Sequence, residues 1–156
     1  MFALSFLFMA SGWTHALGEQ PDLKRLRLQA EEAMAFGDPD GAALNIGKAA
    51  MMASILAKQE NHRQKSTPYR ALSLFFRSQE NTYRAMAMFE RAGNHVPPPS
   101  SVCSSLALGA HQAQRAHEHL RNTHQTSQPV QSVGTQITGW LHTIQEIQED
   151  FHCRTP

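Results

Sequence analysis

Apolar residues recur at helical spacing along most of this chain, and glycines and prolines interrupt them at intervals. The final stretch shows the pattern most clearly, with apolar side chains three and four residues apart from Val130 to Phe151. No segment alternates apolar and polar residues as a half-buried strand does, and no Asn-Gly or Asp-Gly turn joins two alternating runs. The pattern therefore predicts helices and no sheet.

Capping residues indicate where the helices begin. Asp38-Pro39 and Thr67-Pro68 are start signals, because the first side chain can accept from free backbone N–H groups and proline suits the first helical position. Asp22, and either Ser100 or Ser101, are further candidate caps.

Glycines indicate where two of the helices end. Gly37 and Gly93 each follow an apolar periodic stretch, at the place where a glycine commonly ends a helix. Combining starts and ends, we expect helices at about residues 22–36, 39–63, 68–92, 102–123 and 130–152.

We therefore expect an all-α, up-and-down helical bundle of five to six helices. The chain has 156 residues, enough for one domain with a real core. We expect a single helical domain over residues 18–156, and the proline run at residues 97–99 could divide it into two halves hinged at 94–100.

The first 17 residues form an apolar leader with two interpretations. The apolar run from Phe2 to Ala10, with Thr14-His15-Ala16 after it resembling a small-residue cleavage site, has the outline of a secretory signal with cleavage near Ala16. A positive segment before the run is missing, so the leader could instead be a sixth helix that caps the bundle. The run is too short to span a bilayer, and we expect no membrane span.

The two cysteines, Cys103 and Cys153, leave the compartment open. They lie 50 residues apart and could form one disulfide in a secreted protein. Two free thiols suit the cytosol, and an intracellular, cytoplasmic location is the working expectation.

The chain shows no motif of a known catalytic or cofactor site. We find no phosphate-binding glycine loop, no nucleophile elbow and no zinc-protease motif. The histidines from His111 to His124 never fall four residues apart, as two ligands on one helix would. A net charge of +1 argues against nucleic-acid binding. We expect no enzyme, no cofactor, no metal and no nucleic-acid partner.

The helix expected at 68–92 offers the best candidate for a binding surface. Its aromatic and methionine residues outnumber what one buried helix face needs, although core packing explains most of them. If one face stays exposed, it could accept a partner helix in a groove, and arginines seven residues apart could select acidic partners. The candidate residues are Arg70, Phe75, Phe76, Arg77, Tyr83, Arg84 and Met86.

A pattern of small residues suggests a family. It runs through Ala30, Ala33, Gly37, Asp38, Ala42, Ala43 and Leu44. It resembles the first helical hairpin of microtubule-interacting-and-transport (MIT) domains and, more loosely, tetratricopeptide-like hairpins. With the helix after Thr67, the resemblance covers residues 22–93. It implies a non-catalytic adaptor that takes up a partner helix or peptide in an interhelical groove. The alternative is a secreted four-helix-bundle signalling protein with one disulfide.

Overall fold

Five helices make up the part of the chain that the computed structural model describes, which is residues 20–60, 63–122 and 128–153. They are α1 (Pro21–Ala35), α2 (Pro39–Gln59), α3 (Arg63–Arg91), α4 (Ser100–Arg121) and α5 (Gln128–Asp150). The predicted all-α, up-and-down bundle is confirmed. The leader at residues 1–17, and with it the sixth helix, lies outside the described residues.

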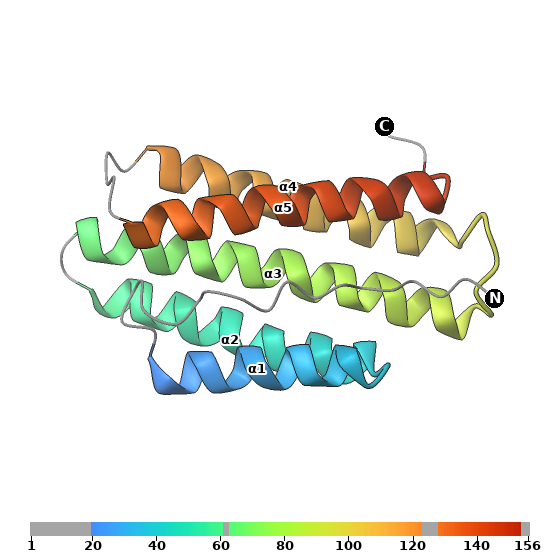
Figure 1. Ribbon diagram of the computed structural model, residues 1–156, viewed down its shortest axis with the longest axis horizontal. Helices are drawn as coiled ribbons and strands as arrows, with labels where there is room; N and C mark the ends of the chain where they lie inside the picture. Colours follow the sequence, from blue (N-terminus) through green and yellow to red (C-terminus); the bar gives the residue numbers. More distant parts are fainter. Residues whose placement is uncertain (1–19, 61–62, 123–127, 154–156) are drawn as a thin grey trace.

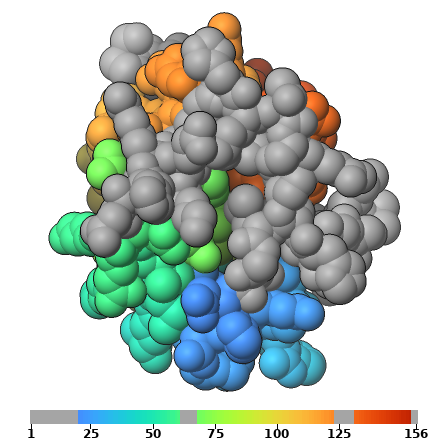
Figure 2. All heavy atoms as spheres, turned by 90° about the vertical axis from the view of Figure 1, so that its left-hand side faces the viewer, coloured from blue at the N-terminus to red at the C-terminus, as the bar shows by residue number. Residues whose placement is uncertain are grey.

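The helices pack mainly in chain order. α1 packs on α2, α2 on α3, α3 on α4 and α4 on α5, with a smaller contact between α3 and α5. The long helix α3 lies in the middle, with α1 and α2 at one edge and α4 and α5 at the other (Figure 1). Viewed from one end, α1 and α2 again lie on one side of the bundle and α4 and α5 on the opposite side (Figure 2). None of the helices described is both long and apolar enough to cross a membrane.

The start signals are partly confirmed. Asp38 caps α2, since its carboxylate accepts from the backbone N–H of Gly41 at 2.8 Å, and Pro39 is the first helical residue. Asp22 is not a cap, because α1 begins one residue earlier and Asp22 pairs with Arg25 in the first turn. Neither serine caps α4, because Ser100 is itself the first helical residue and Pro99 is the cap.

The predicted start at Thr67-Pro68 is wrong, because α3 begins at Arg63 and Pro68 lies inside it. A proline removes one backbone hydrogen bond to the residue four positions earlier and crowds that carbonyl. Pro68 is buried, so packing of its ring offsets this cost. The helix before it is shorter than predicted and ends at Gln59, where Glu60 turns to an extended conformation.

Both predicted glycine ends are confirmed. Gly37 and Gly93 have positive φ angles of 74° and 83°, which a residue without a side chain adopts freely. After each glycine the next N–H turns back to a carbonyl five residues earlier, from Asp38 to Ala33 and from Asn94 to Phe89. These hydrogen bonds satisfy carbonyls that the helix ends would otherwise leave unpaired.

Two clusters of buried side chains form the interior. The larger includes residues from all five helices, with Phe76, Leu23, Ile46 and Ile137 among its fully buried members. This larger cluster therefore contains residues from both sides of residues 94–100. The hinge expected there stays a prediction. The smaller cluster joins α3, α4 and α5 near the end of the chain and comprises Ala85, Val102, Leu106, Ile144, Ile147 and Phe151.

Candidate functional site

The aromatic residues predicted to anchor a partner lie in the core. Phe75, Phe76 and Tyr83 are only 2%, 0% and 4% exposed. Met86 is partly buried against the same cluster. A partner could reach these side chains only if the bundle opened, because neighbouring helices already cover them. Their proposed role as anchors in an open groove is therefore not supported by their position.

Tyr83 shows how closed this region is. Its ring packs edge-on against Trp140 of α5, with the ring centres 5.8 Å apart, and the Trp140 indole N–H donates to the Ser78 hydroxyl at 3.1 Å. Burial raises the pKa of the Tyr83 phenol far above its usual range, and the Glu31 carboxylate on α1 adds to the rise. Tyr83 thus acts as a packing residue between α3 and α5, with α1 close by.

The arginines predicted to select acidic partners bind an internal acid instead. Glu80 is buried, and its two oxygens pair with Arg77 and Arg84, each at 2.6 Å. Gly47 of α2 leaves room for this carboxylate, because a Cβ there would come within 3.0 Å of it. Arg70 is exposed and has no ion-pair partner within the described residues. The three arginines therefore do not form a free row for an acidic partner.

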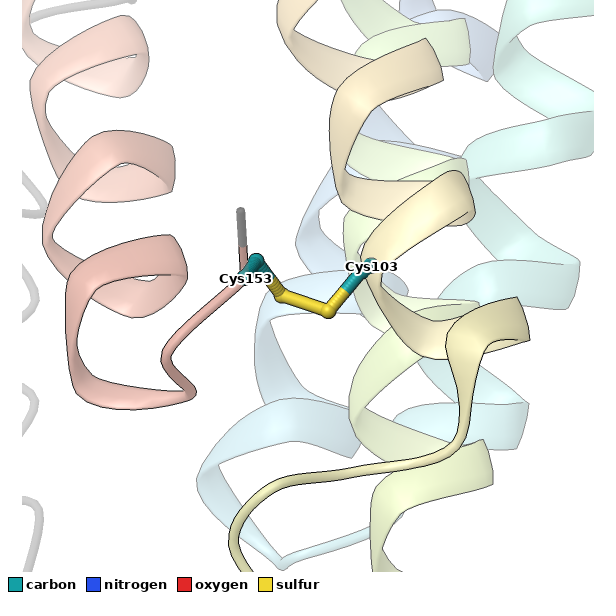
Figure 3. Close-up of a disulfide and its surroundings, with 2 residues drawn as sticks. All are labelled: Cys103 and Cys153. Atoms are coloured by element: carbon teal, nitrogen blue, oxygen red, sulfur yellow. A yellow bond between two sulfur atoms is a disulfide. The ribbon is translucent and has the colours of Figure 1, made fainter. Parts of the chain in front are cut away.

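The two cysteines form a disulfide, Cys103–Cys153, which was one of the two alternatives left open by the sequence. His152 adopts a positive φ of 52° after the end of α5, and the next N–H, of Cys153, donates back to Gln148 at 2.8 Å. This turn brings Cys153 against the first turns of α4, where Cys103 lies (Figure 3). The sulfur of Cys103 is therefore oxidised and is not a free nucleophile.

The described residues contain no cluster of three or more His, Cys, Asp or Glu side chains that could hold a metal ion. The histidine-bearing helix α4 does not assemble such a cluster within this part of the structure. His142 of α5 lies 3.3 Å from Glu146 as an exposed pair along one helix.

An open groove runs between α1 and α2. Its volume is about 870 Å³, and its floor includes Leu26, Ala33 and Met52. Phe36 borders it at the turn between the helices and is 82% exposed. The polar residues along it are Arg25, Gln29, Glu32, Asp38, Asn45 and Lys48, so the groove carries both signs of charge. This is an interhelical groove, but it lies at the edge of the bundle and not beside α3.

A row of exposed apolar residues follows the outer side of α2. Leu44, Met51 and Ile55 are 59%, 57% and 49% exposed. Lys48 and Lys58 fall between and after them, and both are exposed. We call these five residues the outer row. Lys48 also lines the groove, so the outer row and the groove form one continuous surface.

This surface was not among the sites predicted from the sequence. The signal was present, because the five residues follow steps of four, three, four and three. The alanines of the same helix predict that one side of it is buried. Whether the opposite side is covered by another helix depends on tertiary packing, which the sequence does not show. Comparison of the chain with known protein families, with curated proteins and with solved structures found no match.

Proposed function

We propose that this chain is a non-catalytic binding protein of an oxidising compartment, and that the α1–α2 side of its bundle receives a protein partner. The observation that carries the proposal is the Cys103–Cys153 disulfide. Disulfides persist in secreted and other oxidising environments, whereas the cytosol keeps thiols reduced. We therefore propose the secreted location, which was the alternative, in place of the cytoplasmic location that the sequence favoured.

The position of the disulfide supports a structural role. α5 packs chiefly on α4, and its last turn is followed by Cys153. The bond joins residues 50 positions apart and closes a loop that contains most of α4 and all of α5, which restricts the unfolded chain. Phe89 and Phe151 pack against each other in the same cluster as Cys153, with tilted rings whose centres lie 4.1 Å apart, so the bond joins a region that is already packed.

The exposed surface of α1 and α2 supports the binding role. A soluble helix normally turns its large apolar residues inward, and rows of exposed ones mark interaction sites. The MIT-like resemblance, over residues 22–93, covers α2, α3 and all but the first residue of α1, and it also implies binding in an interhelical groove. A second candidate is thus a cytoplasmic adaptor with the same surface and reduced cysteines.

Intact mass of the protein from its own cells separates the two candidates. The cells are lysed in a thiol-alkylating reagent, with and without prior reduction. We expect a chain that lacks about the first 16 residues, as a secretory signal predicts, and that takes up alkyl groups only after reduction. A full-length chain with two thiols that react directly would contradict the proposal and favour the cytoplasmic adaptor.

A further inference from the structure

The outer row of α2 has the spacing of a coiled-coil seam. Steps of four and three residues keep a row on one side of a helix, where the knobs of a second helix can fit. Three of the five positions are large and apolar, and each is about half exposed or more. The opposite side of α2 is already occupied, because its alanines pack in the core. The row is therefore shaped to receive one more helix.

The charges along α2 indicate what kind of partner helix the row would bind. The only charged residues of α2 are Asp40, Lys48 and Lys58. Asp40 is paired with Arg91 of α3 and lies outside the outer row. The row itself therefore carries only the positive charges of its two lysines, while Glu32 and Asp38 line the adjoining groove. A lysine in a seam can lay its methylene stem on the partner and extend its ammonium group to the flank. Acidic residues at the flanks of the partner would meet those ammonium groups.

We infer that the outer row of α2 docks an amphipathic helix with an apolar seam flanked by acidic residues. The inference rests on the proposed function and names the chemistry of its partner. Two copies of this chain paired in parallel fit the row less well. A parallel pair in register would bring Lys48 against Lys48 and Lys58 against Lys58, and like charges in a contact are destabilising.

Two synthetic peptides test the inference on the purified, oxidised protein. Each has about three heptads with Leu at the seam positions. One carries Glu at every position that flanks the seam, and its twin carries Lys there. We expect the Glu peptide to bind at least about tenfold more tightly than the Lys peptide, because the row repels the second. Titration calorimetry measures both affinities.

Variants then assign the binding to the row. Met51→Gln should weaken the Glu peptide about tenfold or more, since Met51 is the middle of the row. Lys48→Glu with Lys58→Glu should invert the preference between the peptides. Arg115→Glu with Arg121→Glu changes the net charge equally on exposed positions of α4 and should leave the preference in place. These side chains are exposed, and circular dichroism should show unchanged helicity in all variants.

Three results would overturn the inference. The first is equal binding of the two peptides, and the second is binding that Met51→Gln leaves unchanged. The third is a dimer of the protein alone that Met51→Gln dissociates in sedimentation, because the occupant is then a second copy. None of these results touches the thiol state or the mass of the native protein, so the proposed function stands or fails separately.

Discussion

The two edges of this bundle are held together in different ways. At the α1–α2 edge, the buried side of α2 is built mostly of alanines, such as Ala42, Ala49 and Ala53. At the α4–α5 edge, α5 buries Ile137, Ile144 and other large side chains. Small residues allow helices to approach closely but bury less apolar area for each residue. The second edge has larger buried side chains and also the disulfide.

The outer faces of the two edges differ as well. α2 exposes Leu44, Met51 and Ile55, whereas the exposed residues of α5 in the described region are polar or glycine. The edge with the covalent bond thus has an outer helix whose exposed side chains are polar, and the edge without it has a helix with exposed apolar residues, for which we propose a partner. The difference suggests that stability and binding are divided between the two edges.

Removal of the disulfide tests the division most strongly. Cys103→Ala with Cys153→Ala should lower the free energy of unfolding by about 4 kcal/mol, because the unfolded chain regains the freedom of a 50-residue loop. Hydrogen exchange should rise first in α5. Denaturant unfolding of the reduced wild-type protein is the matched control. Faster exchange in α1 with α5 unchanged would show that the bond does not hold its own edge.

Leu23→Ala tests the other edge. Leu23 of α1 is fully buried, so its truncation should cost about 3 kcal/mol of unfolding free energy. Since α1 packs mainly on α2 among the described helices, its amides should lose protection before those of α4 and α5. Leu28→Ala on the same helix is the control, because Leu28 is exposed and should change stability by less than about 0.5 kcal/mol. Equal loss of protection in all helices would contradict a separate edge.

Gly109→Ala tests how closely α3 and α4 approach at the centre. A Cβ on Gly109 would lie 3.0 Å from the Thr82 hydroxyl and 3.1 Å from the Ser78 carbonyl oxygen. We expect a loss of about 1–2 kcal/mol in thermal unfolding, because the backbone oxygen cannot move aside alone. Gly134→Ala in α5 meets no atom within 4 Å and should gain about 0.5–1 kcal/mol from helix propensity. Stabilisation by both changes would show that α3 and α4 can separate freely.

Asp38→Ala removes the cap of α2 and should cost about 1 kcal/mol, since the N–H of Gly41 loses its acceptor. Asp22→Ala in the first turn of α1 is the comparison, because Asp22 caps nothing and forms one exposed ion pair. Its effect should stay within about 0.5 kcal/mol. Chemical denaturation of both variants measures the difference, and equal effects would refute the assignment of the cap.

His152→Gly is expected to have the smallest effect. His152 has a left-handed backbone that glycine adopts more easily, so the change should stabilise the protein by about 0.5 kcal/mol. The disulfide should still form, which mass spectrometry after alkylation can verify. A loss of stability would mean that the histidine side chain, and not the turn, positions Cys153.

Much of the fold could be predicted from local patterns. The helical period, the Asp38 cap and the turns at Gly37 and Gly93 each depend on neighbours within five residues, and each is confirmed. Thr67-Pro68 resembles the start of α2 as a sequence, yet the helix continues through it. Local sequence patterns indicate which backbone conformation is preferred. The free energy gained by burying the Pro68 ring can exceed the cost of one lost backbone hydrogen bond.

The candidate site was harder to predict, because it depends on which helix covers which side chain. Apolar residues such as Phe76 and Met51 look alike in a sequence, but the first is enclosed by neighbouring helices and the second faces water. The sequence by itself determined the helices, most of their ends and the absence of strand patterns. The tertiary structure alone decided that Glu80 forms ion pairs with Arg77 and Arg84 and that Cys103 forms a disulfide with Cys153. It also decided that one side of α2 is exposed. The physical reason is that local propensity acts along the chain, whereas burial and pairing act between segments that only packing brings together.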